Sequence, residues 1–184
     1  GDHRDLHSFP TRRSSDLRFF SINSKYPQNE KVVYKMGDSF VCQNAKFTIT
    51  DTYMLKRMDI MNDDDLSEYL EENSDYLKSE DLNLGLIKII ISNTTDDEIT
   101  VDLTAFHIES GAFSLQFYYP LVMYYNDCGM YIKLSKGEQK TFIAPVPISS
   151  EQFLNYDSTD IRNRTYYLVS SLYPQKIMSE VKFN

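Results

Sequence analysis

The 184-residue chain contains no tryptophan, six glycines, three histidines and two cysteines. The cysteines, Cys42 and Cys128, lie far apart and outside any C-x-x-C pattern, which excludes a zinc ribbon and a dithiol redox motif. The few glycines form no Gly-rich phosphate-binding loop. Histidine and cysteine are also too scattered to supply the three or four ligands of a zinc site. These absences predict a protein without a metal or a cofactor.

Positive charge is also in short supply. Lysine and arginine number 19 against 27 aspartates and glutamates, so the net charge is -8 and the pI is about 4.9. Nucleic-acid binding requires a basic stripe that neutralises phosphates and releases counterions. The basic residues are scattered, with no run that would hold the protein on anionic lipid. We therefore expect no nucleic-acid partner, and membrane contact only through a missing N-terminal anchor.

The first 17 residues look foreign to the rest of the chain. Residues 7–17, HSFPTRRSSDL, resemble the translation of a widely used sequencing adapter, so residues 1–17 are excluded from the fold. Residues 18–31 are expected to form a stalk or linker. Because the native N-terminus is expected to be missing, the absence of a signal peptide does not argue for a cytoplasmic protein. His107 becomes the one histidine of the genuine chain.

Alternating apolar and polar side chains dominate from residue 32 onward. Hydrophobic residues make up 41% of the chain and aromatic residues 14%, which fits the half-buried surface of a sheet. The apolar run at 86–91 predicts a central strand, paired in a hairpin with the alternating strand at 99–104. Pro145 lacks a backbone donor, which favours an edge position or the end of a strand. The other predicted strands are 32–35, 40–42, 45–50, 112–119, 121–125, 130–134, 141–146, 166–173 and 177–183.

The number and spacing of these strands predict the fold class. Many short strands without repeated helical crossovers are typical of an all-β protein. We therefore predict an immunoglobulin-like antiparallel β-sandwich over residues 32–184. One short helical insertion is expected at about 62–79, within an otherwise β-rich chain.

The predicted helical insertion carries an apolar face and many acids. Leu66, Tyr69 and Leu70 fall on one side of a helix. Asp65 is the predicted N-cap, and Glu68 completes a capping box. The acidic run lacks the alternating spacing and central glycine of an EF-hand loop. A solvated helix face is therefore favoured over a calcium site.

Three short segments carry a family resemblance. Residues 34–38 (YKMGD), 86–94 (LIKIIISNT) and 134–142 (LSKGEQKTF) resemble telokin-like, immunoglobulin-like domains of unknown function. Such domains occur in lipoproteins and membrane-anchored exported proteins of Gram-positive bacteria. The resemblance implies an extracytoplasmic protein, either anchored at the cell surface or secreted. It brings no activity, and the acidic insertion at 59–81 departs from the simplest members.

No set of residues with a catalytic pattern emerges from the sequence. A Ser-His-Asp or Cys-His arrangement would have to use His107, which we interpret as a partly buried structural histidine. Acidic residues are numerous, but no pair is marked by its surroundings for glycoside hydrolysis. We therefore predict no catalytic residue and no enzyme activity.

A tyrosine-rich segment is the strongest candidate for contact with a partner. Tyr118, Tyr119, Tyr124 and Tyr125 follow one another closely, and exposed tyrosines supply binding area at a low entropy cost. The alternative is that most of them pack in the core or across strands. For Cys42 and Cys128, a disulfide and a pair of buried free thiols both remain open.

These observations favour a non-catalytic extracytoplasmic binding or interaction module. Its partner is expected to be an unknown protein or a component of the cell envelope. One alternative is an accessory or immunity-type protein of an exported system. Another is a carbohydrate-active enzyme that uses two carboxylates at the separation such chemistry requires.

Overall fold

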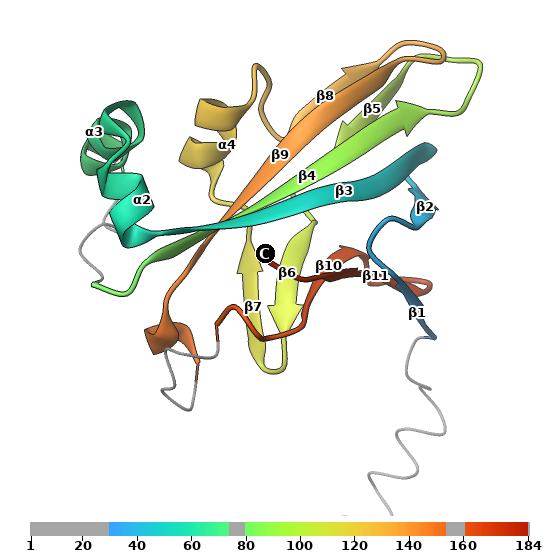
Figure 1. The fold of residues 1–184 in the computed structure, drawn as a ribbon. Helices are drawn as coiled ribbons and strands as arrows, with labels where there is room; N and C mark the ends of the chain where they lie inside the picture. The colour runs from blue at the N-terminus through green and yellow to red at the C-terminus, as the bar shows by residue number, and fades with distance from the viewer. Residues whose placement is uncertain (1–29, 74–79, 154–160, 184) are drawn as a thin grey trace, which may run out of the picture.

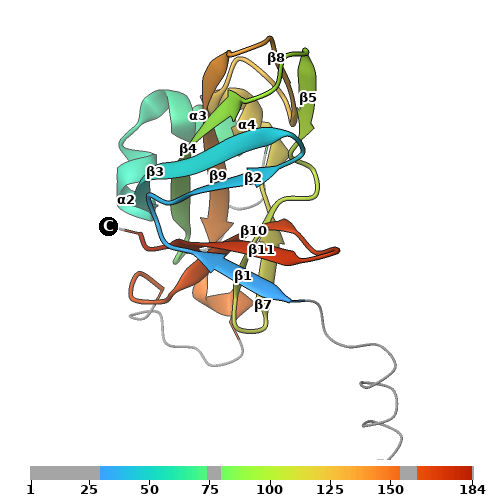
Figure 2. The ribbon, with the colours of Figure 1, turned by 90° about the vertical axis from the view of Figure 1, so that its right-hand side faces the viewer.

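The structure is a computed structural model that describes residues 30–73, 80–153 and 161–183. Two β-sheets pack against each other and form an upper and a lower layer in Figures 1 and 2. The predicted adapter segment at 1–17 lies outside the described residues. The same holds for residues 18–29 of the predicted stalk and residues 74–79 of the predicted helical insertion.

The two layers differ in strand number. The lower layer has five strands in the order β1-β11-β10-β6-β7, the upper layer has four in the order β2-β3-β4-β9, and β5 and β8 form a separate pair. The strands are β1 (Lys31–Tyr34), β2 (Ser39–Cys42), β3 (Ala45–Lys56), β4 (Asn83–Asn93), β5 (Ile99–Asp102), β6 (His107–Ser110), β7 (Phe113–Gln116), β8 (Tyr131–Leu134), β9 (Gln139–Ile148), β10 (Tyr166–Ser171) and β11 (Lys176–Val181). The sequence pattern did not predict β6 as a separate strand.

Side chains from both layers form one continuous core. In β4 every second side chain from Ile87 onward is buried, as expected for a strand with one face on the core. Phe47 stacks on Phe40 with ring centroids 5.3 Å apart, and it contacts Phe106 at the same centroid distance. Buried residues of the lower strands join the same cluster. The protein is therefore a mostly-β sandwich with a few short helices.

Gly85 in β4 shows how closely Phe183 packs against the upper layer. A Cβ atom at this position would lie 2.6 Å from the Phe183 ring. That ring in turn packs edge-on against Tyr166, with centroids 5.2 Å apart. Only glycine leaves room for Phe183 at this point of the sheet.

One predicted strand pairing and the wholly antiparallel arrangement are wrong. β4 lies centrally between β3 and β9, as predicted, but β5 pairs with β8 instead of β4. The buried amide of Asn93 donates to the carbonyls of Leu134 and Ser135, which ties the turn after β4 to the β8–β9 turn. In addition, β1 pairs with β11 in parallel, so the sandwich is not wholly antiparallel. Residues 36–38 carry β1 straight to the other layer, so no hairpin requires an antiparallel neighbour.

Two helices lie in or directly before the predicted insertion at 62–79. They are α2 (Arg57–Met61) and α3 (Asp64–Asn73). The N-cap of α3 is Asp63 rather than Asp65, because the Asp63 Oδ1 atom accepts the backbone N–H of Leu66 at 3.0 Å. Within the described ranges, no helix is long and apolar enough to span a membrane.

A further helix replaces a predicted strand. Residues 121–125 were predicted as a strand, but they belong to α4 (Tyr119–Tyr125). Pro120 lies in the first turn of α4, where the missing backbone donor has no intrahelical partner to lose. Short apolar runs cannot be divided between helix and strand by periodicity alone. The part of the chain that the structure describes thus has three short α-helices, whereas a single helical insertion was predicted.

The helices cover one end of the upper layer on the face turned away from the main core. Leu84 and Leu86 of β4 belong to this outer face, and the helices lie together at the left end of the sheet in Figure 1. The buried residues of this second cluster, here named the outer cluster, are Ile60, Leu66, Leu70, Leu82, Leu84 and Leu121. It holds α3 and α4 against the same end of the sheet.

Candidate partner-binding surface at helix α4

Helix α4 has one buried side and one exposed side. Leu121 packs in the outer cluster and Val122 in the main core. Tyr119 and Met123, one turn apart on the opposite side, are 56% and 45% exposed. Gly129 lies beside both, since a Cβ there would lie 3.7 Å from the Tyr119 ring and from the Met123 Sδ atom. An aromatic and a thioether side chain therefore form a shared apolar surface on a helix anchored from below.

Asn126 fixes the end of α4 to the edge of β9. Its side-chain Nδ2 donates to the Ile143 carbonyl at 2.9 Å, and its Oδ1 accepts the Ile143 N–H at 2.8 Å. The side chain thus pairs with β9 as a neighbouring strand would. Farther along the same edge, Pro145 and Pro147 have no N–H to offer, and Tyr118 N–H donates to the Pro145 carbonyl at 3.2 Å. The prediction of an edge position for Pro145 is confirmed.

Three tyrosine rings join α3 to α4. Tyr69 of α3 lies 5.0 Å from Tyr124 of α4, and Tyr124 meets Tyr125 edge-on at 5.0 Å. The Tyr69 hydroxyl donates to the Pro120 carbonyl at 2.8 Å. These contacts set the two helices in a defined relation, so the exposed side of α4 is presented rigidly.

The phenols on this surface are held in their neutral form. Burial raises the pKa of Tyr124, and the carboxylates of Asp63 and Asp65 raise it further. Burial, then Tyr124 and Asp63, raises the pKa of Tyr125 more strongly. Both effects disfavour the charged phenolate. The two tyrosines act as hydrogen-bonding aromatic groups rather than as nucleophiles.

A pocket of about 520 Å³ opens beside α4. One wall is the segment 125–128 that follows the helix, and the other wall is β9 from Gln139 to Ile143. Lys140 brings a cation to this pocket, although its Nζ atom already contacts the Lys133 carbonyl and Glu138. Burial raises the pKa of the Cys128 thiol, with Lys140 acting in the opposite direction. A neutral thiol is a poor nucleophile, so the pocket favours binding over thiolate chemistry.

The acidic face of α3 borders this surface. Its exposed acids carry no ion pair to a described lysine or arginine. These acids are Asp63, Asp64, Asp65, Glu68, Glu71 and Glu72. In the described ranges, no three His, Cys, Asp or Glu side chains gather so as to hold a metal ion.

The four tyrosines named from the sequence divide into two groups. Tyr119 is exposed, whereas Tyr118, Tyr124 and Tyr125 are half-buried against the outer cluster. The strand interpretation would have turned alternate residues outward, but the helix turns Tyr119 and Met123 outward together. Met123 was missed because it shares a face with Tyr119 only at helical spacing. Tyr69 was not predicted to belong to this group of tyrosines, because it lies far from them in the sequence and contacts Tyr124 only in the folded structure.

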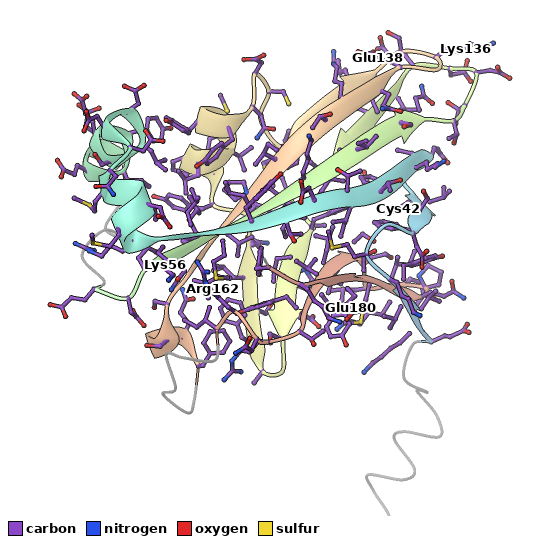
Figure 3. All side chains as sticks on the ribbon, viewed as in Figure 1. Cys42, Lys56, Lys136, Glu138, Arg162 and Glu180 are labelled. Atoms are coloured by element: carbon purple, nitrogen blue, oxygen red, sulfur yellow. The ribbon has the colours of Figure 1, made fainter. Side chains whose placement is uncertain are left out.

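The two cysteines are free thiols in the structure. The Cys42 Sγ lies 3.5 Å from the Ser170 carbonyl, and Figure 3 shows this residue on β2. Cys128 lies in the pocket beside β9. Because β2 and β9 are opposite edges of a four-stranded sheet, three strand spacings of about 4.8 Å separate these edges. A disulfide needs Cα atoms within about 7 Å, so the disulfide alternative is wrong in this structure.

His107 is part of a small ionic network on the lower layer. Its Nε2 lies 3.0 Å from a Glu109 carboxylate oxygen, and Lys176 Nζ lies 2.5 Å from the other. The histidine side chain is 13% exposed, which confirms the prediction of a partly buried residue. Burial alone would raise the pKa of Glu109, but hydrogen bonds and charges from Lys176 and His107 outweigh it and lower the pKa. The carboxylate therefore stays ionised.

The chain is similar to solved structures from Gram-positive bacteria. The ycdA protein of Bacillus subtilis, described as a candidate lipoprotein, matches with a TM-score of 0.50 and 13% identity, over 78% of this chain and 38% of that one. The chain thus spans less than half of that protein, and at this identity the likeness shows the fold alone. The yjhA protein of Bacillus subtilis matches with a TM-score of 0.42 and 13% identity, over 82% and 99% of the two chains. An uncharacterised β-sandwich protein of Clostridium difficile 630 gives 0.41 and 13%, over 84% and 98%.

The family comparison covers most of the chain. Comparison with curated proteins found no match. Residues 23–177 match the profile of the family described as Domain of unknown function (DUF5028). This range contains the three resemblance segments and both layers of the sandwich except most of β11. It also contains the exposed side of α4 around Tyr119 and Met123, here named the α4 surface. The chain therefore belongs to the DUF5028 family.

Proposed function

We propose that this domain is a non-catalytic, extracytoplasmic binding module whose α4 surface contacts a protein partner. The observation that carries the proposal is the pair Tyr119 and Met123, exposed side by side on α4. The outer cluster, the main core and the Asn126 contact with β9 hold this helix in place. Exposed apolar residues on a rigid element bind with little loss of conformational entropy. Methionine adapts its shape to a partner, and tyrosine adds a hydroxyl for a hydrogen bond.

The partner is proposed to be a positively charged protein surface. The exposed acids of α3 border the α4 surface, and their charge acts on Tyr124 and Tyr125. Such a field favours basic partners and accelerates their encounter with the surface. Tyrosine faces also attract lysine and arginine side chains. The proposed contact therefore combines an apolar centre at Tyr119 and Met123 with an acidic rim.

The cell envelope is the proposed location. The resemblance of the three sequence segments to exported, membrane-anchored domains supports this location, as does the likeness of the fold to ycdA.

We also propose the finer fold assignment, a telokin-like or immunoglobulin-like sandwich. Two facing sheets around one core support that assignment, although β1 adds a parallel pair.

A non-catalytic role is part of the proposal. Glycoside hydrolysis requires a carboxylic acid with a raised pKa to protonate the leaving group. Glu109 has the opposite character, because Lys176 and His107 hold it ionised despite its burial. The α4 surface likewise offers neutral phenols and a neutral thiol. These groups suit recognition better than bond cleavage.

The test is a capture experiment on the envelope of a bacterium that carries this gene. Wild-type domain, the double variant Tyr119→Ala/Met123→Ala, and the control double variant Val41→Ala/Leu172→Ala are immobilised at equal density. The control removes two exposed apolar side chains of similar exposure, one on β2 and one after β10. We expect the first variant to lose at least about 30-fold in affinity for the captured protein, and the control to lose less than about threefold.

Salt dependence tests the acidic rim separately. Raising the ionic strength from about 0.05 M to about 0.5 M should weaken the interaction, because screening acts on exposed charges. A partner retained equally by wild type and by the Tyr119→Ala/Met123→Ala variant would refute the α4 surface as the contact. An affinity that rises with salt would refute a basic partner.

A further inference from the structure

A second pocket, of about 380 Å³, lies at the opposite end of the molecule from α4. Its walls are the β6–β7 turn, the end of the short 3-10 helix at Ser150–Gln152 and the segment leading into β10. In Figure 1 the β6–β7 turn lies at the bottom and α4 at the upper left. The lining residues are Ser110, Gly111, Ala112, Phe113, Gln152, Phe153 and Arg164, none of which belongs to the α4 surface.

The positive charge in this pocket has no ion-pair partner among the described residues. The Arg164 Nε atom is buried and has no hydrogen-bond partner. Across the described part of the chain, no carboxylate forms an ion pair with its guanidinium. Arginine is always charged, and a buried donor without an acceptor is unfavourable. Arg164 is therefore an unusual feature in a chain with a net charge of -8.

A neighbouring arginine shows what a structural role looks like. Arg162 donates from its Nη2 atom to the Met54 carbonyl at 2.9 Å, and it is marked in Figure 3 near Lys56. That contact ties the segment before β10 to β3. Arg164 makes no comparable bond to any described residue, so no contact among those residues accounts for its polar atoms.

The position of Arg164 is nevertheless well defined. Its guanidinium carbon lies 4.3 Å from the centre of the Phe153 ring. The Ser110 hydroxyl donates to the Thr165 carbonyl at 3.0 Å, and the Tyr166 hydroxyl donates to the Ile161 carbonyl at 2.8 Å. These bonds hold the backbone on both sides of Arg164. The ring contact orients its planar fork, as a binding site for a planar anion requires.

The rest of the pocket is mostly apolar. Phe113 and Phe153 pack with ring centroids 4.8 Å apart, and both are buried. No acidic residue is among the described residues that line it. A volume of this size is at the lower end of pockets that hold small organic ligands. The walls therefore fit an apolar or aromatic body, and the guanidinium fits one carboxylate attached to it.

We propose that this pocket binds a small organic carboxylate, with the carboxylate paired to Arg164 and the apolar part packed against Phe113 and Phe153. The site is separate from the α4 surface, so either proposal can fail without the other. Binding would neutralise the charge of the Arg164 guanidinium group. Aromatic and aliphatic acids belong to the same ligand class, and the experiment distinguishes them.

The test is calorimetric titration of the whole chain with three acids. The probes are 3-phenylpropanoate, indole-3-acetate and hexanoate, and 3-phenylpropanamide serves as an uncharged control of similar shape. We expect at least one acid to bind and the amide to bind about tenfold more weakly or not at all. Tighter binding of the two aromatic acids than of hexanoate would indicate ring stacking on Phe153.

Variants separate a ligand-binding arginine from a structural one. Arg164→Gln should weaken acid binding by about tenfold or more, and Arg164→Lys should give an intermediate loss because it keeps the charge but not the fork. Lys136→Gln, an exposed lysine in the β8–β9 turn, controls for the change in net charge. Since Arg164 loses only its contact with the Phe153 ring, and no hydrogen bond or ion pair to the described residues, Arg164→Gln should keep the melting temperature within about 2 °C of wild type.

The outcomes are decisive in each direction. Failure of all three acids to bind folded wild-type protein at millimolar concentration would overturn the proposal. Equal binding of 3-phenylpropanoate by wild type and Arg164→Gln, or of the acid and the amide by wild type, would overturn it as well. A large drop in the melting temperature of Arg164→Gln would show a structural role. In that case Phe153→Leu, which keeps an apolar residue, must still weaken 3-phenylpropanoate for the site to stand.

Discussion

The two faces of the upper sheet carry hydrophobic clusters that are built in different ways. On the inner face, Phe47, Ile89 and Phe142 come from adjacent strands and alternate with outward residues. On the outer face, the outer cluster is assembled from α2, α3, α4 and one end of β4. The inner cluster runs the length of the sheet, whereas the outer one covers a single end.

This difference explains why the candidate binding surface lies where it does. A strand offers one side chain in two to each face, so a continuous core needs only an alternating pattern. The outer face must recruit helices from separate segments, and each helix keeps one side for solvent. The exposed side of α4 is a product of that arrangement. Recognition surfaces are often found where such elements are held by a rigid scaffold.

The largest expected effect tests the inner cluster against the outer one. Phe47→Ala should lower the free energy of unfolding by about 3–5 kcal/mol, because Phe47 lies between the rings of Phe40 and Phe106. Leu70→Ala in the outer cluster should cost less, about 2–3 kcal/mol, because fewer elements depend on it. Urea unfolding followed by circular dichroism measures both values. A larger loss for Leu70→Ala would reverse the order of importance proposed for the two faces.

A smaller loss of stability is expected where Asn126 joins α4 to β9. Asn126→Ala should cost about 2 kcal/mol, because it leaves the Ile143 N–H at a half-buried edge without an acceptor. Gln43→Ala is the matched control. Gln43 makes the same two-bond contact with the backbone of Asp102, but at an exposed turn, and its loss should cost about 0.5–1 kcal/mol.

Hydrogen exchange sharpens the Asn126 prediction. Amide protection should fall in α4 in the Asn126→Ala variant and remain unchanged in the lower layer. Uniform loss of protection throughout the chain would mean that α4 and the sandwich unfold as one unit. That result would show that the outer cluster around α4 is not less stable than the main core of the sandwich.

The smallest effect concerns the ionic network on the lower layer. Glu109→Gln should lower the free energy of unfolding by about 1–2 kcal/mol at pH 7, since it removes the charged partner of Lys176. The pKa of Glu109 is lowered in the folded state from its ordinary value of 4.5. Its contribution is therefore present above pH 4.5 and is lost as the pH falls through the lower folded value. Unfolding free energies measured from pH 7 down to pH 3 should converge for wild type and variant.

A control on the same sheet isolates the role of Glu109. Glu180 pairs with Lys182 at a more exposed position, at an Oε1–Nζ distance of 2.8 Å. Glu180→Gln should cost less than about 0.5 kcal/mol, as exposed pairs contribute little. If the two variants lose the same stability at pH 7, the network around His107 has no special strength.

Strand positions were predictable because alternation is a local property of the chain. The central position of β4 and the edge position of Pro145 follow from side-chain character alone, and both are confirmed. Pairing was less predictable. The partner of β5 depends on the buried amide of Asn93, whose acceptors lie about 40 residues away in the sequence.

The α4 surface was only partly predictable from the residues. The concentration of tyrosines at 118–125 marked the region, but the strand interpretation assigned the wrong sides. Tyr119 and Met123 form one surface only if the segment is helical, and Pro120 is compatible with either a helix start or a strand break. Nothing in the sequence marked Arg164, because the lack of a hydrogen bond to its Nε atom can be recognised only in three dimensions.

The amino-acid sequence by itself determined that this protein is mostly β, acidic and poor in the residues that metals and nucleophilic catalysis require. Those properties follow from composition and from a period of two, which need no knowledge of distant contacts. Tertiary structure decided which strands pair, which side of α4 faces solvent, that Cys42 and Cys128 stay apart, and that Arg164 lines an apolar pocket. These outcomes depend on packing between segments far apart in the chain, where burial and hydrogen-bond satisfaction outweigh local preference.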